Sequence, residues 1–131
     1  RIELEVLPAC RALGLGLLPW SPLAGGILGG RGETTGRRTN DMAKQRTEKH
    51  QAALAAHEAL CRELGESPAT VSLAWLLAQP GVTSVIIGPR TVSQLTQCYR
   101  ALEVESTEQT LLRLDEIWPG PGNAAPEAYA W

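Results

Sequence analysis

Several recurrent patterns are missing from this 131-residue sequence. No apolar run is long enough to span a membrane, and no signal-peptide pattern opens the chain. The formal net charge of −2 argues against a surface made to bind nucleic acid. The cysteines are too widely and irregularly spaced for a metal pattern or a disulfide framework; they are Cys10, Cys61 and Cys98. We therefore expect a cytoplasmic protein with no metal, no nucleic-acid partner and no membrane insertion.

Two familiar nucleotide motifs are also missing. Gly14 and Gly16 precede a predicted strand, whereas a dinucleotide fingerprint follows one, and the third glycine is absent. Residues 25–36 lack the Gly-Lys-Ser/Thr ending of a phosphate loop. His50 and His57 lie two turns apart on one predicted helix, too far to share a metal ion without another ligand. We interpret His50 as part of a polar face and His57 as a packed side chain.

What is present is the pattern of one globular domain, with 44% hydrophobic and 20% charged residues. Strand-like runs alternate with helical stretches, which is typical of βα units and a parallel sheet. Strands are predicted at residues 15–20 and 82–87, and a long loop at 27–46. Helices are predicted at residues 2–13, 47–64, 68–79, 91–102 and 106–117. Because two parallel strands cannot bury both faces of a sheet, this α/β fold should be incomplete by itself.

The first predicted strand leads into the stretch around which the chain is organised. Its apolar run, a buried strand by pattern, ends in a turn rich in Pro and Gly that carries Trp20 and Ser21. Ligands of α/β folds bind at the carboxyl ends of the strands. Trp20 offers a flat surface on which a ring could stack, and the hydroxyl and backbone amides of the turn offer polar partners. The alternative is an ordinary buried Trp followed by a turn.

The second predicted strand ends in a basic turn, Gly88-Pro89-Arg90. Thr91 then begins a helix with Gln94 three residues later, which is a capping-box pattern. Parallel strands place this turn at the same end of the sheet as Trp20. A helix amino end beside an Arg is a sound phosphate site, although Arg90 as a simple solvent-facing residue is the alternative. The basic loop at 27–46 could also serve a phosphate, or be merely a solvated loop.

Four stretches together resemble the carboxyl-terminal part of the aldo-keto reductases. They are Gly14-Leu-Gly-Leu-Leu-Pro-Trp-Ser-Pro-Leu-Ala-Gly-Gly26, Ser67-Pro-Ala-Thr-Val-Ser-Leu-Ala-Trp-Leu-Leu77, Val85-Ile-Ile-Gly-Pro-Arg-Thr-Val-Ser-Gln-Leu95, and the ending from Pro119 to Trp131. The likeness covers nearly the whole chain and is greatest to the bacterial and potassium-channel beta-subunit branch. It implies part of a TIM (β/α)₈ barrel, with the two predicted strands as the seventh and eighth. Since such a barrel needs about 250 residues, residues 1–131 would form an incomplete barrel domain without the early strands.

The resemblance also implies a site for NADPH. Trp20 would stack on the nicotinamide ring, and the residues after it would line the pyrophosphate: Ser21, Pro22, Leu23, Ala24 and Gly25. Arg31 and either Arg37 or Arg38 would reach the phosphates. Gly88 and Arg90 would hold the 2′-phosphate side, and Gln94 the adenine side. Gln97 and Cys98 stand where the family usually has Glu and Asn, and a thiol is a weaker hydrogen-bonding group than an amide.

The catalytic group of the family has no counterpart in this sequence. Its proton-donor Tyr, activating Lys, Asp and His belong to the early strands, and neither Tyr99 nor Tyr129 occurs in that motif. Cys98 has no His near it in sequence that would make it a nucleophile. Hydride transfer needs a cofactor and an acid catalyst together, so we expect this chain to supply part of the cofactor site and no catalytic residue.

Three interpretations follow. The first is the carboxyl-terminal segment of an NADPH-dependent oxidoreductase acting on aldehydes and ketones. The second is a non-catalytic cofactor-binding or interaction module, either a regulatory subunit or a half-barrel that pairs with itself. The third is an inactive gene remnant. The first residue is Arg1, in what reads as an uncapped helix, which leads us to expect a piece of something longer, with the remaining part of the barrel or another copy as its partner.

Overall fold

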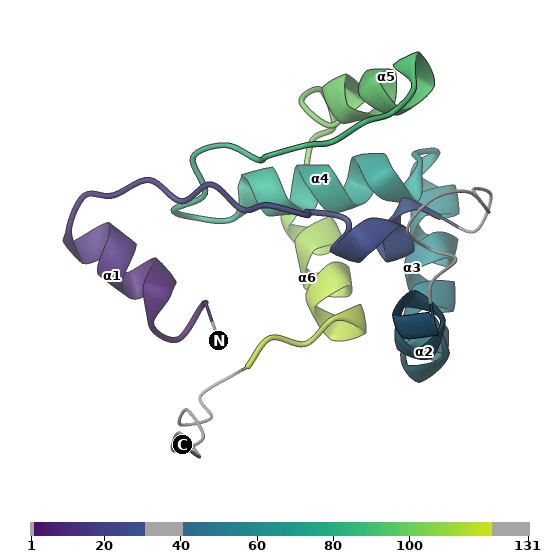
Figure 1. Ribbon diagram of the computed structural model, residues 1–131, viewed down its shortest axis with the longest axis horizontal. Helices are drawn as coiled ribbons and strands as arrows, with labels where there is room; N and C mark the ends of the chain where they lie inside the picture. Colours follow the sequence, from purple (N-terminus) through teal and green to yellow (C-terminus); the bar gives the residue numbers. More distant parts are fainter. Residues whose placement is uncertain (1, 31–40, 122–131) are drawn as a thin grey trace.

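The computed structural model describes residues 2–30 and 41–121. Turns at the start lead into helix α1 (Val6–Ala12), and an extended segment and the 3₁₀ helix η1 (Ala24–Gly29) follow it. The remaining elements are α2 (Asp41–Lys49), α3 (Gln51–Leu64), α4 (Pro68–Ala78), α5 (Val92–Arg100) and α6 (Glu108–Ile117). Figure 1 shows α4 in the middle of the molecule, with α1 set apart from the other helices.

The central helix α4 begins where the sequence predicts. Ser67 is its N-cap and accepts a hydrogen bond from the Thr70 amide at 3.1 Å, while Pro68 occupies the first turn, where no amide partner is needed. The side chains from Ala69 to Ala74 are all buried. Two core clusters therefore form on different sides of one helix.

The first core cluster joins α3, α4 and α6, and contains Leu60, Cys61, Val71 and Leu114 with Trp75 and Ile117 packed against it. The second joins α4 and the chain around α5, and contains Leu73, Ala74 and Ala101. Leu23, Val85 and Cys98 pack against this second cluster. The turn after the first extended segment and the second extended segment itself thereby pack on the same two helices, α4 and α5.

The helix predicted at 47–64 is two helices, α2 and α3, with a break at His50, whose φ is −111° and ψ is 21°. The loop predicted at 27–46 ends earlier, because α2 already begins at Asp41. This short helix is polar, so no apolar periodicity marks it, but Asp41 in its first turn and Lys49 in its last complement the helix dipole.

Other helix ends agree with the sequence to different degrees. Gly65 ends α3 in the left-handed conformation with a φ of 70°, as its position predicts. The N-cap of α6 is Thr107, one residue after the Ser106 that the capping pattern suggested; its hydroxyl accepts from the Thr110 amide at 3.2 Å. Helix α1 covers only Val6–Ala12 of the predicted 2–13. None of the described helices has the length and apolarity that crossing a membrane requires.

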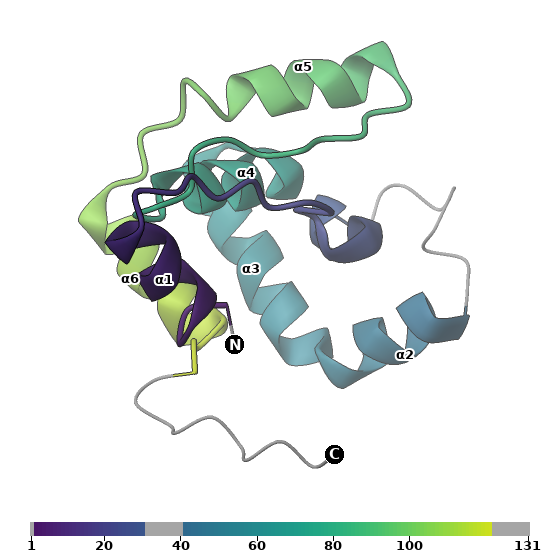
Figure 2. The same cartoon turned by 60° about the vertical axis from the view of Figure 1, so that its left-hand side comes forward.

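The prediction of regular strands at residues 15–20 and 82–87 is wrong. The described residues form only isolated parallel bridges between these segments, Leu17 with Val82 and Trp20 with Ile86. Hydrogen bonds from Thr83 N to Leu17 O (2.9 Å) and from Ile86 N to Pro19 O (2.9 Å) support them. Figures 1 and 2 show the segments side by side in the same direction. A two-segment sheet has no further neighbour at either edge, and Pro19 has no N–H to extend the ladder.

The first segment is also not the buried strand that its apolar run predicts, and the second segment is exposed as well. Leu18 is 53% exposed, Trp20 77% and Ile86 54%. Helix α4 and its neighbours do not cover the whole of the paired segments, and the described part of the chain offers nothing else to pack on them. The prediction that the two segments pair in parallel is correct, and this pairing brings their carboxyl ends together at the site.

Candidate functional site

A pocket of about 360 Å³ lies where the two extended segments end. Its walls come from the turn after Trp20, the turn at residues 88–90, and one side of α5, and α4 closes its floor. The lining residues are Trp20, Ser21, Pro22, Leu23, Gly25, Gly26, Gly29, Ala69, Leu73, Ile86, Ile87, Gly88, Pro89, Arg90, Gln94, Gln97 and Cys98. Segments far apart in the sequence thus meet at the same end of the paired segments.

Trp20 stands at the mouth of this pocket. Its backbone forms the parallel bridge to Ile86, which fixes the position of the first turn relative to the second. The side chain is 77% exposed although an indole usually contributes to a core. An indole that lines a pocket with most of its surface open is suited to stack against a planar ring.

The backbone after Trp20 takes unusual conformations. Ser21 and Ala24 have positive φ values of 54° and 51°, which are uncommon for residues with a side chain and are concentrated at functional sites. Gly25 and Gly26 follow at 75° and 98°. The three successive left-handed residues from Ala24 to Gly26 curl the chain tightly, and the Ala24 and Gly26 amides donate to Ser21 O and Leu23 O within the turn, at 3.0 and 2.8 Å. Backbone amides of such a turn that no internal bond uses can bind an anion. The sequence identifies this turn by its glycines but gives no sign of the strained Ser21.

The second wall is held by the capping residues of α5. Thr91 Oγ1 accepts a hydrogen bond from Gln94 N at 3.2 Å, and Gln94 Oε1 accepts one from Arg90 N at 2.7 Å. The amino end of α5 brings a partial positive charge to the pocket. The Arg90 side chain is exposed and has no ion-pair partner in the part of the chain that the structure describes. This combination is suited to bind a phosphate.

The third wall is the inner side of α5, which a buried threonine ties to α4. Thr70 is 1% exposed, and its hydroxyl donates to Gln97 O at 3.2 Å. The neighbouring Cys98 is half-buried, and burial raises the pKa of its thiol. Cys98 is therefore a neutral, weak hydrogen-bonding group at this wall at neutral pH.

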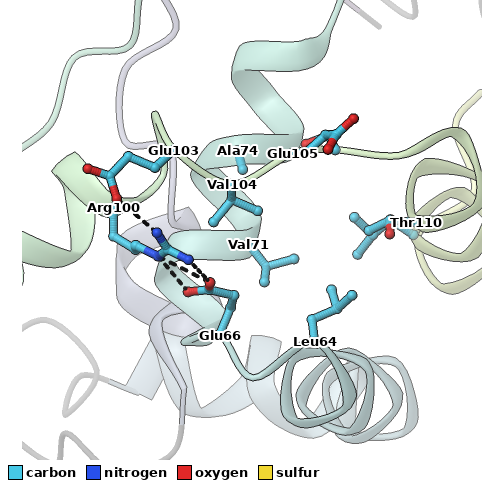
Figure 3. Close-up of a pocket in the computed structure, with 11 residues that line it drawn as sticks. Leu64, Glu66, Val71, Ala74, Arg100, Glu103, Val104, Glu105 and Thr110 are labelled. Carbon is cyan, nitrogen blue, oxygen red and sulfur yellow. Dashed lines mark hydrogen bonds and ion pairs between the residues drawn. The ribbon is translucent and has the colours of Figure 1, made fainter.

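A second pocket, of about 210 Å³, lies at the carboxyl end of α5 (Figure 3). The guanidinium of Arg100 contacts Glu66 Oε1 at 2.6 Å and Glu103 Oε2 at 2.8 Å. Hydrogen bonds and charge from both carboxylates raise the pKa of Arg100 further, so its guanidinium stays protonated. Its positive charge is balanced by the two carboxylates. Arg100 therefore differs from Arg90 in having no charge left for an anion.

Comparison with known proteins identifies the family. The model of the aldo/keto reductase family matches residues 1–119, which is most of the chain. The chain belongs to the aldo/keto reductase family. Membership of this family implies that the chain is part of a (β/α)₈ barrel.

Individual relatives agree with this assignment. An uncharacterized oxidoreductase, YrpG, of Bacillus subtilis strain 168 is 52% identical over 131 residues, which cover 98% of this chain and 40% of the relative. A probable aldo-keto reductase 1 of Glycine max is 33% identical, covering 90% of this chain and 36% of the relative. A probable voltage-gated potassium channel subunit beta of Oryza sativa subsp. japonica is 32% identical, covering 79% and 35%. The aldo/keto reductase chain thus spans well under half the length of these relatives.

The pocket brings together most of the residues that the family resemblance singled out. Ten of them line it: Trp20, Ser21, Pro22, Leu23, Gly25, Gly88, Arg90, Gln94, Gln97 and Cys98. Ala24 does not line the pocket, because it shapes the turn through its backbone instead. Arg31 and Arg38, like Arg37, lie outside the described residues. Whether these residues hold a cofactor stays a prediction.

Sequence reasoning missed the floor and part of the rim: Gly26, Gly29, Ala69, Leu73, Ile86, Ile87 and Pro89. Ala69 and Leu73 lie four residues apart on α4 and so share one face. The sequence shows that this helix is apolar around most of its circumference, so it predicts burial but cannot tell which apolar side faces a pocket.

The described lining contains no Tyr, Lys, His, Asp or Glu. Tyr99 is 63% exposed on α5 and does not line the pocket. Within residues 2–30 and 41–121, no group of three or more potential metal ligands comes together. The pocket of this aldo/keto reductase chain can therefore stack, hydrogen-bond and attract an anion, but has no general acid or base.

Proposed function

We propose that residues 1–131 form the dinucleotide-binding part of an NADPH-dependent oxidoreductase that reduces aldehydes and ketones to alcohols. The observation that carries the proposal is that Trp20 and Arg90 line one pocket although 70 positions separate them in the sequence. A nicotinamide dinucleotide has a planar ring at one end and a phosphorylated ribose towards the other. The exposed indole and the unpaired guanidinium supply complementary groups for these two ends.

The remaining walls suit the rest of such a ligand. The left-handed turn from Ser21 to Gly26 would face the pyrophosphate, which needs backbone donors rather than bulky side chains. Gln97 and Cys98 would contact the adenine side. When bound, the reduced cofactor supplies the hydride. Arg90 favours NADPH over NADH in this proposal, because only the former carries a 2′-phosphate.

Protonation of the reduced carbonyl would come from outside this chain. The lining holds no acid–base side chain, and the chain corresponds to 40% of the first relative's length. We propose that the amino-terminal part of the barrel, in the cytoplasm, completes the domain and brings the proton donor, with a small carbonyl compound as substrate. The exposed Leu18 and Ile86 would then pack against that part.

The alternative function is a non-catalytic cofactor-binding module. The absence of an acid–base side chain from the described lining favours it, and among the relatives is a protein named a channel subunit beta. Both functions predict cofactor binding, so binding alone cannot separate them. They differ in whether the chain supports carbonyl reduction once a family amino-terminal part is joined to it.

The binding test uses the 131-residue chain, titrated with NADP⁺ and with NAD⁺ while tryptophan fluorescence is followed. Arg90→Gln should raise the Kd for NADP⁺ roughly tenfold or more and leave that for NAD⁺ nearly unchanged, because a charge-assisted contact is lost. Arg113→Gln is the matched control, since Arg113 already pairs with Glu63 at 2.6 Å on another side of the chain. Equal losses for both nucleotides would contradict the assignment of Arg90.

The activity test compares the isolated chain with a chimera in which it replaces the matching carboxyl-terminal segment of the Bacillus subtilis relative. We expect the chimera, but not the isolated chain, to oxidise NADPH with 4-nitrobenzaldehyde. Trp20→Ala in the chimera should weaken cofactor binding because the stacking surface is removed. Binding without turnover in a folded chimera would favour the non-catalytic module, and turnover by the isolated chain would contradict the division of roles.

A further inference from the structure

Away from the pocket, three polar side chains form a buried hydrogen-bonded series. Trp118, the residue that ends α6, donates its indole N–H to Nδ1 of His57 at 3.2 Å. Nε2 of the same imidazole lies 3.2 Å from Ser72 Oγ. His57 is 3% exposed and Ser72 is 6% exposed. The series joins α3, α4 and the end of α6, and the proposed function makes no use of it.

The directions of these hydrogen bonds are fixed by chemistry. An indole N–H can only donate, so Nδ1 of His57 must carry a lone pair. The ring proton of the neutral imidazole therefore lies on Nε2 and points to Ser72 Oγ. Ser72 in turn donates its hydroxyl proton to Pro68 O at 2.7 Å, which leaves its oxygen free to accept. All three contacts can be made together only by the neutral Nε2–H form.

A second proton on His57 would break its hydrogen bond with Trp118 and leave its hydrogen bond with Ser72 in place. Nδ1–H would then face the N–H of Trp118, and an indole cannot turn to present an acceptor. The Ser72 contact would persist, because Nε2 remains a donor. Protonation thus acts selectively on the contact that holds Trp118.

The surroundings favour the neutral form. Burial lowers the pKa of His57, and the Pro68 backbone and the Glu58 carboxylate oppose this effect more weakly. Helix α4 carries no titratable side chain. The charged groups on the other helices packed against α3 are Asp41, Lys44, Arg46, Glu48 and Lys49 on α2, and Glu108, Arg113, Asp115 and Glu116 on α6. His50 also contacts the indole, with ring centroids 5.9 Å apart.

We propose that His57 and Trp118 form a proton-operated latch that holds the end of α6 and the segment after it against α3. The neutral imidazole closes the latch by accepting the indole N–H, and the imidazolium opens it. The body of α6 stays docked when the latch opens, because Leu114 is 3% exposed in the core and Arg113 pairs with Glu63. Opening therefore frees the chain from Trp118 to Pro121 without undoing the helices.

The test is a pH titration of the ¹⁵N-labelled 131-residue chain from pH 8 to 5, observed by NMR. We expect His57 in the Nε2–H tautomer at pH 8. As His57 becomes protonated, the protection of the Trp118 indole N–H, measured against the intrinsic exchange rate at the same pH, should fall at least tenfold, while amides of α3 and α4 keep their protection. An indole N–H whose protection stays constant while the His57 ring resonances report protonation would overturn the latch, and so would a His57 that stays neutral down to pH 5. Simultaneous loss of protection throughout α3 and α4 would overturn it as well.

Three variants assign the effect. Trp118→Phe keeps an aromatic ring but removes the donor, so the pKa of His57 should rise towards its usual value. His57→Gln offers an acceptor and a donor at once, and should make the Trp118 signal independent of pH between 8 and 5. His50→Gln should leave the wild-type response intact. If His50→Gln abolished the pH response of the Trp118 indole, the response would belong to His50 and the proposal would be overturned. If His57→Gln fails to fold, the titrations of Trp118→Phe and His50→Gln decide.

Discussion

The side chain of Gln94 holds the backbone of Arg90, with 2.7 Å between the amide oxygen of Gln94 and the amide nitrogen of Arg90. In a capping box the third helical residue reaches back to the N-cap amide, which here is Thr91. Gln94 reaches one residue further and so fixes the turn that carries the guanidinium. The same side chain lines the pocket. A residue that the resemblance places at the adenine thus also has a structural role, which is to order the adjoining basic turn.

We predict that Gln94→Ala loosens this turn and that Gln94→Glu does not. Alanine removes the acceptor of the Arg90 amide, and one hydrogen bond is worth about 1 kcal/mol, so exchange of that amide should accelerate roughly fivefold. Glutamate keeps an acceptor in the same place. Hydrogen exchange followed by NMR measures the difference, and equal protection of Arg90 N–H in the wild type and Gln94→Ala would contradict the role.

A second prediction concerns the contact between α4 and α5. Thr70→Val preserves the shape of the side chain but removes its hydroxyl, which donates to Gln97 O and is also hydrogen-bonded to Ser67 Oγ at 2.7 Å; Gln97 O keeps the Ala101 N–H as a donor. We expect the free energy of unfolding to fall by about 1–3 kcal/mol in urea denaturation. Thr96→Val is the matched control, because Thr96 bonds only to Val92 O within the same exposed helix turn. Similar losses of unfolding free energy in the two variants would show that the hydrogen bond between α4 and α5 stabilises the chain no more than a bond within one helix turn.

Local chemistry explains what the sequence predicts well. Ser67 and Thr91 cap helices through their own side chains, and Gly65 ends α3 because it tolerates a positive φ. Each of these signals acts within a few residues of its position. The meeting of Trp20 and Arg90 follows from a more general rule, that the carboxyl ends of parallel segments lie at one edge.

What the sequence does not predict depends on contacts beyond the local chain. Ser106 and Thr107 are both able to cap α6 by residue type, and the structure has Thr107 in that role with Leu114 of the same helix in the core. The residue types at 82–87 predict a strand, but a regular strand requires neighbours on its edges and faces, and Ile86 remains 54% exposed. The positive φ of Ser21 leaves no trace in the sequence at all.

The third prediction concerns alkaline pH. Burial raises the pKa of the Cys61 thiol from 9.0 to about 11, with Glu58 acting in the same direction. The folded chain therefore binds this proton more tightly than the unfolded chain, and the resulting stability is present below pH 9 and lost as pH rises to about 11. Unfolding free energies measured between pH 8.5 and 11 should fall less steeply in Cys61→Ala than in the wild type. Cys10→Ala controls for removing a thiol, and identical slopes in wild type and Cys61→Ala would refute the prediction.

The last prediction tests how the paired segments position the pocket. A Cβ on Gly16 would lie 2.5 Å from Thr83 Oγ1 and 3.3 Å from Thr83 Cβ, so the two segments pass each other at a distance that only glycine permits. Gly16→Ala must push them apart next to the bridge between Leu17 and Val82. The Thr83 amide should then exchange faster. Any nucleotide affinity of the chain should fall, because the paired segments would no longer hold the turns at Trp20 and Arg90 at a fixed distance from each other. Gly29→Ala is the control for the Thr83 amide alone, since a Cβ there meets nothing within 4 Å and φ is not positive, whereas Gly29 itself lines the pocket. An unchanged Thr83 amide in Gly16→Ala would mean that the threonine side chain simply rotates away and that the close approach does not set the spacing of the segments.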